Sequence, residues 1–491
     1  MALRPVRFCM RIAFVGKSCP IAGEIVARLQ KTGFAAFWVG GCVRDVLLGR
    51  EPQDYDIATD ARPEQIEKLF ERTLAVGRKF GVMVVVENKQ HFQVATFRAE
   101  ADYQDGRRPG KVVFSNAKAD ARRRDFTVNG LFFDPIAKKL HDWVGGEKDL
   151  RAKIIRTIGT PEERFAEDHL RLLRAIRFAA QLGFEIEPET FAAVKKLAPK
   201  IELISAERIR DELIKLFAPP EAPPGGPPSG GGARLSAAAT AANIRHAAGE
   251  DTRAPAARGL VLLRDSRLLP GVLPELIATI LCEQSPDYHP EGTVFEHIRL
   301  MLEKLPPDAS PSLPWAVILH DIAKPATAER DATTGVIHFY GHEKVGAAMA
   351  ERILKRLRFP NKQIEGIVAC VRNHMQFKDV RQMRKATLRR LLLRDTFPLE
   401  LQLHRLDCLG SHGDLENYEF LLAQAEELKK KPAIRPALLT GKDLIKLGMK
   451  PGPAMGKLLA EIREKQLADE LKNPREAKAW AKKYLQINEK E

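Results

Sequence analysis

The stretch that most constrains this chain lies between residues 40 and 60 and reads GGCVRDVLLGREPQDYDIATD. The apolar run before it predicts a buried strand that enters a glycine turn, and the residues after the turn predict a short helix that ends at Gly49. A second strand is predicted in DYDIAT. Because side chains two residues apart project from the same face of a strand, we expect Asp54 and Asp56 to point into one site.

Two carboxylates held in this way suit Mg²⁺, which prefers carboxylate oxygens together with substrate phosphates. A D-x-D pair on a strand is, taken alone, more often a solvated edge. The neighbouring turn at Gly40 and Gly41 favours chemistry, because bare backbone can approach a phosphate closely. This region therefore predicts a site for a metal ion and a phosphate group.

The composition limits the class of function. The chain has 491 residues, of which 44% are hydrophobic and 29% charged, as in ordinary folded proteins with several domains. Its formal net charge of +15 favours a polyanionic partner such as nucleic acid. No apolar run is long enough for a transmembrane helix. Six cysteines without paired spacing predict reduced thiols, so we expect a cytoplasmic protein.

Shifts in composition divide the chain into five segments. Residues 20–148 alternate short β-rich runs with helices and predict a head domain with a small mixed sheet, whereas residues 149–218 predict a helical neck. Residues 219–259 are rich in Pro, Gly and Ala and predict a flexible insertion. Residues 260–425 and 426–491 predict a helical body and tail. The expected fold class is α+β, with an α/β head followed by all-α parts.

Basic residues follow the strands of the predicted head. In ARRRDFTVNGLFFDP, Arg123 and Arg124 offer guanidinium donors for a triphosphate, and Asp125 and Asn129 are placed to orient them. A basic surface strand is the alternative interpretation. Residues 95–114 are polar and rich in turn residues, so we expect a mobile loop there.

The segment EERFAEDHLRLLRAIRFAAQLGF predicts a single helix in the neck. Four charged residues recur on it at three-residue steps, namely Asp168, Arg171, Arg174 and Arg177. They are either exposed ion pairs or readers of a nucleobase. A carboxylate can accept from an exocyclic amine, and arginine can donate to the ring nitrogen or carbonyl beside it.

Together these motifs resemble the class II tRNA nucleotidyltransferase and poly(A) polymerase family, almost continuously from residue 38 to residue 217. The resemblance implies that Asp54 and Asp56 are catalytic and bind Mg²⁺, which would activate a ribose hydroxyl and stabilise pyrophosphate. It implies nucleotide contacts from Gly40, Gly41, Arg44, Arg124, Asp125 and Asn129, base reading by Asp168 and Arg171, and phosphate contacts by Arg174 and Arg177. No third carboxylate ligand can be chosen from the sequence, and the insertion at 219–259 departs from the family.

The body carries a second set of metal-binding residue types. His297, the pair His320-Asp321, and Asp407 occur in the order H…HD…D. This order resembles the HD phosphohydrolase domain, which implies a second divalent transition metal. His342 and His374 are candidates to complete a larger site. A relic domain without metal is the alternative.

Three functions follow from these resemblances. The first is a CCA-adding enzyme, which adds CMP, CMP and AMP from CTP and ATP to the 3′ end of tRNA. The second is a poly(A) polymerase or an enzyme that adds only CC or only A. The third is an RNA-binding HD phosphohydrolase with a silent head. Because Asp54 and Asp56 are both present, a silent head is the weakest of the three hypotheses. The DGRRP stretch favours the CCA-adding enzyme. No membrane and no protein partner is implied.

Overall fold

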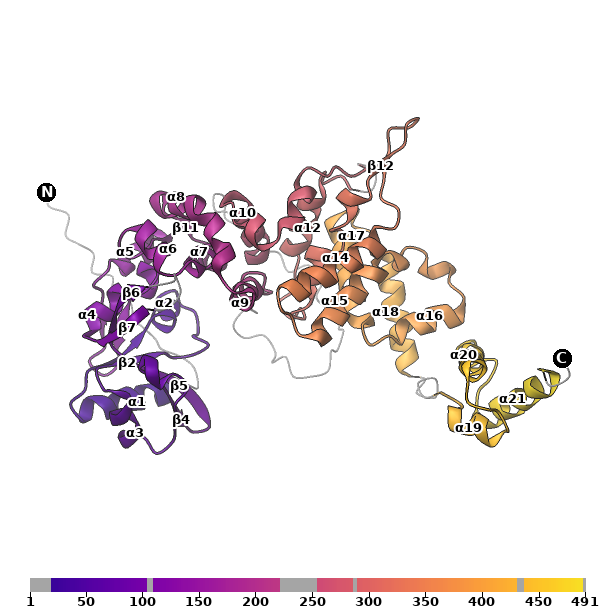
Figure 1. The fold of residues 1–491 in the computed structure, drawn as a ribbon, viewed down its shortest axis with the longest axis horizontal. Helices are drawn as coiled ribbons and strands as arrows, with labels where there is room; N and C mark the ends of the chain where they lie inside the picture. The colour runs from indigo at the N-terminus through magenta and orange to yellow at the C-terminus, as the bar shows by residue number, and fades with distance from the viewer. Residues whose placement is uncertain (1–18, 104–108, 221–253, 286–288, 431–436, 489–491) are drawn as a thin grey trace. The chain divides into compact units, whose positions relative to one another are not determined.

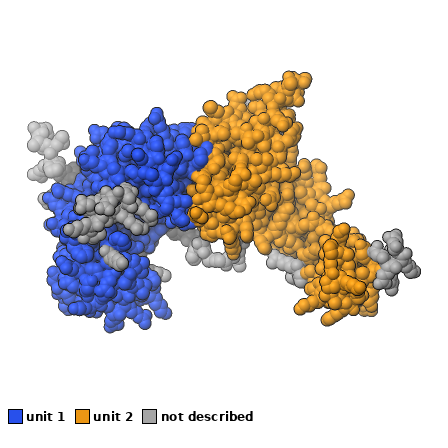
Figure 2. All heavy atoms as spheres, in the orientation of Figure 1, with its two compact units in different colours: residues 1–217, 236–274 blue, residues 218–235, 275–491 orange. Residues whose placement is uncertain are grey.

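The computed structural model describes residues 19–103, 109–220, 254–285, 289–430 and 437–488. These form two compact units, shown in different colours in Figure 2. The first unit comprises residues 1–217 and 236–274, and the second comprises residues 218–235 and 275–491. The predicted start of the body at residue 260 is therefore too early, since the first unit continues to Pro274.

The head is built on a seven-stranded mixed sheet with the strand order β3-β4-β5-β2-β1-β8-β9. Neighbouring strands are antiparallel except for β2 and β5, which are parallel. The strands are β1 Ala36–Val39, β2 Ile57–Thr59, β3 Thr73–Leu74, β4 Val82–Glu87, β5 Gln90–Thr96, β8 Phe132–Asp134 and β9 Lys139–His141. The predicted α+β class with a mixed sheet in the head is confirmed (Figure 1).

Short helices cover this sheet. Helix α1 (Cys19–Lys31) buries Ala22, Ile25, Val26 and Leu29, and it packs on β1 and β2. Helix α3 (Pro63–Leu69) packs on β4. Other short elements of the head are α2 Gly41–Leu47, η1 Arg78–Phe80, α4 Ala117–Arg122 and η2 Thr127–Asn129. The predicted order of strand, glycine turn, short helix and strand is present as β1, α2 and β2.

The segment 95–114 is not the loop that its polar composition predicts. Its backbone forms an antiparallel hairpin of β6 (Arg98–Tyr103) and β7 (Pro109–Phe114), with Arg98 opposite Phe114. The Arg98 amide donates to the buried carboxylate of Asp120, which anchors the start of the hairpin. Residues 104–108, which contain most of DGRRP, lie outside the described residues.

The neck is helical, but its central helix is broken in two. Its elements are α5 Gly146–Ala152, β10 Ile154–Ile155, α6 Pro161–Glu167, α7 Leu170–Leu182, β11 Glu185–Ile186, α8 Pro188–Leu197, η3 Ala198–Leu203, α9 Ala206–Leu216, α10 Pro255–Asp265 and α11 Leu269–Val272. The predicted single helix ends at Glu167, because Asp168 is extended and its side chain accepts from the Leu170 amide. A short polar side chain that bonds nearby backbone in this way competes with the helix.

The insertion is shorter than predicted, since α10 begins inside the range 219–259. Pro255 stands at the first helical position, where its missing amide costs no hydrogen bond. Gly259 packs so closely on α9 that a Cβ atom there would lie 2.6 Å from Leu216. Arg258 donates to the carbonyl of Phe184. Residues 221–253 lie outside the described part of the chain.

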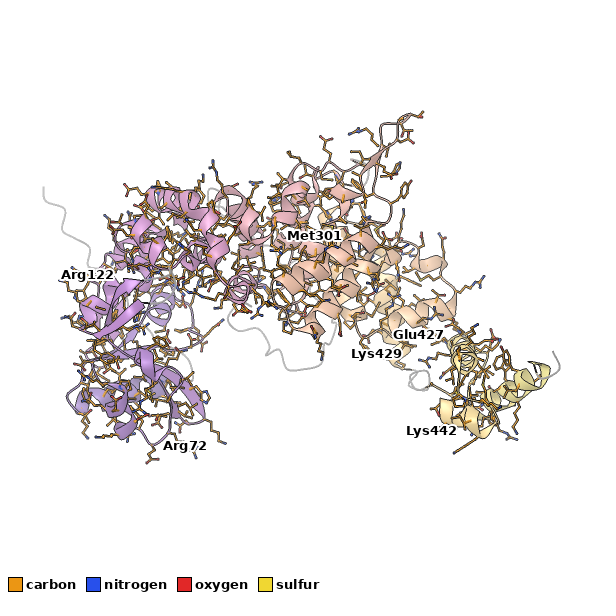
Figure 3. All side chains as sticks on the ribbon, in the orientation of Figure 1. Arg72, Arg122, Met301, Glu427, Lys429 and Lys442 are labelled. Carbon is orange, nitrogen blue, oxygen red and sulfur yellow. The ribbon has the colours of Figure 1, made fainter. Side chains whose placement is uncertain are left out.

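The second unit is almost entirely helical. Its elements are η4 Pro274–Ile280, α12 Val294–Glu303, α13 Leu313–Leu319, η5 Lys324–Ala326, β12 Glu329–Arg330, β13 Ile337–His338, α14 His342–Arg356, α15 Asn361–Asn373, η6 His374–Phe377, η7 Val380–Gln382, α16 Lys385–Leu392, α17 Phe397–Gly410 and α18 Glu416–Lys429. Helices α12, α13, α15 and α17 pack on one another. Met301 of α12, labelled in Figure 3, is completely buried in this packing.

Three helices form the tail, α19 Gly441–Lys446, α20 Pro453–Leu467 and α21 Pro474–Asn488. They share a small apolar core that includes Leu444, Leu458 and Ala477. The predicted boundary at residue 426 falls inside α18, which continues to Lys429. Within the described ranges, no helix combines the length and the apolar character needed to cross a membrane.

Candidate functional site

The two catalytic candidates in the head lie where β2 begins. Asp54 and Asp56 belong to the extended residues that lead into β2, and the carbonyl of Asp56 accepts from the Val39 amide at 3.0 Å. Tyr55 between them is buried, whereas Asp54 is exposed and Asp56 half-buried. The alternation places both carboxylates on the side of the chain that faces away from the core, directly beside the end of β1.

Neighbouring side chains balance the negative charge of Asp54 and Asp56 only in part. Burial raises the pKa of the Asp56 carboxyl to about 6, and the neighbouring Asp54 carboxylate raises it too, while Arg124 lowers it. Two close carboxylates repel each other, and a divalent cation between them would remove that repulsion. The donor set, two oxygens with one of them open to solvent, fits a hard ion such as Mg²⁺.

The glycine turn after β1 makes room for an arginine. Gly40 has a φ of +75°, and a Cβ atom there would lie 2.8 Å from Nη1 of Arg124. Asp120, only 1% exposed, accepts from Nη2 of Arg124 at 3.2 Å. Arg124 also lies over the ring of Phe132. Its guanidinium is therefore held against the bare backbone of the turn.

Four further candidates form one buried hydrogen-bonded chain. Arg44 of α2 donates to Asn129 at 2.7 Å, Asn129 donates to Asp125 at 3.1 Å, and Arg174 of α7 donates to Asp125 at 2.8 Å. Burial alone would raise the pKa of Asp125, but Arg174 and Asn129 hold it well below its usual range. The chain fixes the Arg44 guanidinium beside Gly41, where a Cβ atom would lie 3.7 Å from its Nη2.

One arginine of the head and two of the neck gather around one aromatic ring. Arg44, Arg174 and Arg177 each lie over Phe178, at 5.2, 5.1 and 4.1 Å from the ring centre. Arg177 donates to Glu212 of α9 at 2.6 Å. Glu212 is buried and also lies 3.7 Å from Arg174, so it balances much of this positive charge.

The two predicted base readers lie at the break between α6 and α7. Asp168 accepts from Arg208 of α9 at 2.7 Å. Arg171 donates to the carbonyl of Arg164 at 2.8 Å and forms an ion pair with Glu167. The backbone brings the two residues to one helix start, but their side chains are held by different partners.

The four metal ligands predicted in the body are brought together. Nε2 of His297 on α12 lies 3.1 Å from Asp407 of α17, and Nε2 of His320 lies 3.1 Å from Asp321. Both ring nitrogens of His297, Nε2 of His320 and Oδ1 of Asp321 are buried without an aligned hydrogen bond. Donor atoms that are close together, buried and unaligned fit a site built around a cation.

A glycine sets the approach of the helices that carry these residues. A Cβ atom on Gly410 would lie 2.8 Å from Met301 and 3.5 Å from the ring of His297. Met301 follows His297 by one turn of α12, and Gly410 follows Asp407 by about one turn of α17. The close contact of the two helices therefore brings His297 within reach of Asp407.

Comparisons with known proteins find three matching family models. Residues 36–156 match the poly A polymerase head domain, residues 183–225 match the "Probable RNA and SrmB- binding site of polymerase A", and residues 333–480 match the tRNA nucleotidyltransferase domain 2. A CCA-adding enzyme of Staphylococcus aureus strain MRSA252 is 46% identical over 196 residues, which are 40% of this chain and 49% of that protein. The chain thus spans about half the length of the curated relatives it matches.

Two solved structures resemble nearly the whole length of this chain. The Bacillus stearothermophilus CCA-adding enzyme in complex with CTP has a TM-score of 0.67 and 25% identity over 97% of this chain and 100% of that chain. The Thermotoga maritima CCA-adding enzyme complexed with tRNA shares the fold, with a TM-score of 0.53 and 17% identity over 96% and 97% of the two chains. In these stretches the chain is similar to the class II tRNA nucleotidyltransferase and poly(A) polymerase family. The HD resemblance of its body stays a prediction.

The sequence did not reveal the residues that hold the predicted site residues in place. Asp120 binds Arg124, Arg208 binds Asp168, and Glu212 binds Arg177. In the body, Glu291 lies 2.6 Å from Nδ1 of His297 and Lys324 lies 2.7 Å from Asp321. A signal was available for Asp120 and Lys324, which stand about one helical turn from Arg124 and Asp321.

The turn at Gly40 provides a test of the Arg124 contact. Gly40→Ala should cost about 1–2 kcal/mol of backbone strain and displace Arg124, so nucleotide transfer should fall about tenfold or more. Gly33→Ala is the matched control, because Gly33 has a φ of +91° with open space around it. Thermal denaturation should show similar destabilisation of both variants. Equal loss of transfer in the two variants would mean that the Arg124 contact has no role.

Proposed function

We propose that this protein is a CCA-adding enzyme that transfers CMP, CMP and AMP from CTP and ATP to the 3′ end of tRNA. The observation that carries the proposal is the aspartate pair at the start of β2, where the Asp56 backbone pairs with β1 next to the glycine turn and the charge of Arg124 acts on the Asp56 carboxyl. The 46% identity of the head and neck to a CCA-adding enzyme supports the same activity. The formal net charge of +15 agrees with a tRNA substrate.

Asp54 and Asp56 would hold the Mg²⁺ ions. When bound, the metal would supply activation of the 3′ hydroxyl and neutralisation of the pyrophosphate. Arg124 and Arg44 offer guanidinium donors to the triphosphate, and the bare backbone at Gly40 and Gly41 lets it come close. The buried carboxylates Asp120 and Asp125 keep the donors that bind the triphosphate in position before the nucleotide arrives.

We assign selection of the base to Asp168 and Arg171. Arg171→Ala should weaken the preference for CTP and ATP over UTP and GTP by roughly 10- to 100-fold, since a bidentate contact to a base edge discriminates by about 1–3 kcal/mol. Arg151→Ala, which alters an exposed arginine of α5, is the control. Competition between labelled nucleotides measures the ratio. A preference unchanged within about twofold would leave Arg171 a structural residue, bound to Glu167.

The narrower alternatives differ in their products. A poly(A) polymerase would extend unstructured RNA with many A residues, and an enzyme that adds only CC or only A would use one nucleotide alone. Extension of tRNA transcripts with CTP and ATP supplied separately distinguishes all three.

The buried cluster of the body supports a second activity. We propose that His297, His320, Asp321 and Asp407 hold a divalent transition metal that supports hydrolysis of a phosphoester. The substrate class is a 2′,3′-cyclic phosphate or a terminal phosphate at an RNA end, because its removal restores the free hydroxyl that the head requires. His297, His320 and Asp321 are buried, with donor atoms within 4.8 Å of one another, and this convergence favours the candidate over a relic fold.

A further inference from the structure

Arg164 of α6 lies between the triphosphate-binding candidates of the head and the base-reading candidates of the neck. Its guanidinium donates to the carbonyl of Arg124 at 2.8 Å and to the carbonyl of Arg123. The same guanidinium forms an ion pair with Glu167, which also binds Arg171. The Arg164 side chain is only 12% exposed. Arg164 therefore contacts both parts of the proposed nucleotide site.

The backbone brings α6 close to the residues that follow α4. An isolated antiparallel bridge joins Phe126 to Thr157. A turn follows at Gly159, which has a φ of +86°, a conformation that glycine adopts without steric cost. A Cβ atom on Gly159 would lie 3.8 Å from Cδ of Arg164, so the turn lies against the stem of this arginine. The bridge and the turn together direct the Arg164 guanidinium toward the end of α4.

The carbonyls that Arg164 binds stand just after α4. The last carbonyls of a helix have no amide partner within the helix, so water or a side chain must bind them. Arg123 and Arg124 are the two residues after α4, and one guanidinium binds both of their carbonyls. A positive charge is also favourable beside the negative end of a helix. Arg164 thus fixes the backbone from which the Arg124 side chain extends to the turn at Gly40.

Glu167 connects Arg164 to the base-reading side. One oxygen of its carboxylate, Oε2, accepts from both Arg164 and Arg171. Arg171 also donates to the carbonyl of Arg164 at 2.8 Å, and its Nη2 lies 3.4 Å from the Arg123 carbonyl that Arg164 binds. A guanidinium presents its donors in a fixed planar arrangement. A displacement of Arg171 therefore changes the contacts that hold Arg164.

We propose that Arg164 is a positioning residue that couples base reading at Arg171 to the placement of the triphosphate-binding Arg124. The proposal rests on the nucleotide-transfer function proposed above. A base that fits lets Arg171 donate to the base edge while it keeps Glu167, and Arg124 stays in place for the triphosphate. A base that does not fit displaces Arg171 and, through Glu167 and Arg164, the backbone of Arg124. Discrimination then acts on the rate of transfer as well as on nucleotide binding.

Two measurements on Arg164→Ala test this coupling. The preference for CTP and ATP over UTP and GTP should fall roughly tenfold or more, because the base reader loses its support. The dissociation constant of inorganic triphosphate, a probe without a base, should rise about tenfold or more, because the backbone of Arg124 is no longer held. Arg171→Ala should leave this constant unchanged within about twofold, since Arg164 keeps Glu167 and both carbonyls. A change in only one of the two values for Arg164→Ala, or in neither, overturns the coupling.

Arg258→Ala is the matched control. Arg258 is buried, donates to the carbonyl of Phe184 at 2.8 Å and pairs with Glu185, so its loss removes the same kinds of contact outside the nucleotide site. It should lower the melting temperature about as much as Arg164→Ala does and leave both values unchanged. Equal changes of both values in the two variants would show general destabilisation and overturn the coupling.

A second variant covers the case in which Arg164→Ala does not fold. Arg164→Lys keeps the positive charge, but one ammonium cannot reproduce the planar contacts to two carbonyls and Glu167, so both values should change in the same direction. A wild-type chain that transfers no nucleotide to tRNA would contradict the proposed function and the coupling together. An active, selective wild-type chain whose Arg164 variants keep both values contradicts only the role of Arg164.

Discussion

Replacing Asp54 or Asp56 by asparagine is expected to lower nucleotide transfer roughly 10³-fold or more. Asparagine keeps the shape of the side chain but removes the negative charge that a divalent cation requires. The loss should therefore appear in kcat, whereas the affinity for tRNA should stay nearly unchanged. Single-turnover transfer at saturating Mg²⁺ measures the effect, and a filter-binding assay measures tRNA affinity.

Asp60→Asn is the control for this experiment. Asp60 stands at the other end of β2, is exposed, and accepts only from the Ala35 amide in the described structure. Asparagine can still accept that hydrogen bond, so transfer should remain normal. Near-normal turnover of Asp54→Asn or Asp56→Asn would contradict the assignment of the metal ligands.

The second large effect is expected in the body. His320→Ala combined with Asp321→Asn should abolish hydrolysis of 2′,3′-cyclic AMP, measured with Ni²⁺, Mn²⁺, Co²⁺ or Mg²⁺ in turn, because the two residues supply facing donor atoms of the proposed metal site. Transfer of nucleotides by the head should be unaffected. Asparagine at position 321 is preferred to alanine, because it keeps an acceptor for the buried Lys324.

A variant of the head tests whether transfer and hydrolysis belong to separate sites. Asp54→Asn should leave the hydrolysis intact while transfer is lost. His412→Ala, which alters a histidine outside the cluster near the end of α17, should change neither activity. If the wild-type protein hydrolyses no phosphoester with any of these metals and binds none in the body, the cluster has only a structural role.

The local signals in the sequence were sufficient to predict how Asp54 and Asp56, the proposed metal ligands, are placed. Alternation along a strand, a glycine turn and a short helix are features of consecutive residues, and they predicted the neighbourhood of Asp54 and Asp56. The H…HD…D order likewise predicted that His297, His320, Asp321 and Asp407 would lie near one another.

Apart from Asp120 and Lys324, the partners of the site residues could not be predicted, because these contacts join distant segments. Asp168 and Arg208 are 40 residues apart, and Arg44 and Asn129 are 85 residues apart. In neither pair does the spacing of residues along the sequence indicate which partner the side chain will contact. The single helix predicted across Asp168 was wrong for a related reason, since apolar spacing does not register a side chain that bonds its own backbone.

Composition led to a wrong prediction in two places. The hairpin of β6 and β7 looked like a loop because its residues are charged, yet antiparallel backbone pairing does not need apolar side chains on both faces. The first turn of α10 looked like part of the insertion because it contains Pro, Ala and Gly. Burial of Gly259 against Leu216 accounts for that composition, and this contact exists only in the folded chain.

The most direct test of the central claim is the product made on tRNA. Three transcripts of one tRNA are prepared that lack the whole CCA end, the last two nucleotides or only the terminal A, and each is incubated with CTP, with ATP and with both. We predict that each transcript is completed to CCA and then extended no further, with CTP used before ATP. A long A tail, or tailing of an unstructured RNA, would contradict CCA addition and identify a poly(A) polymerase.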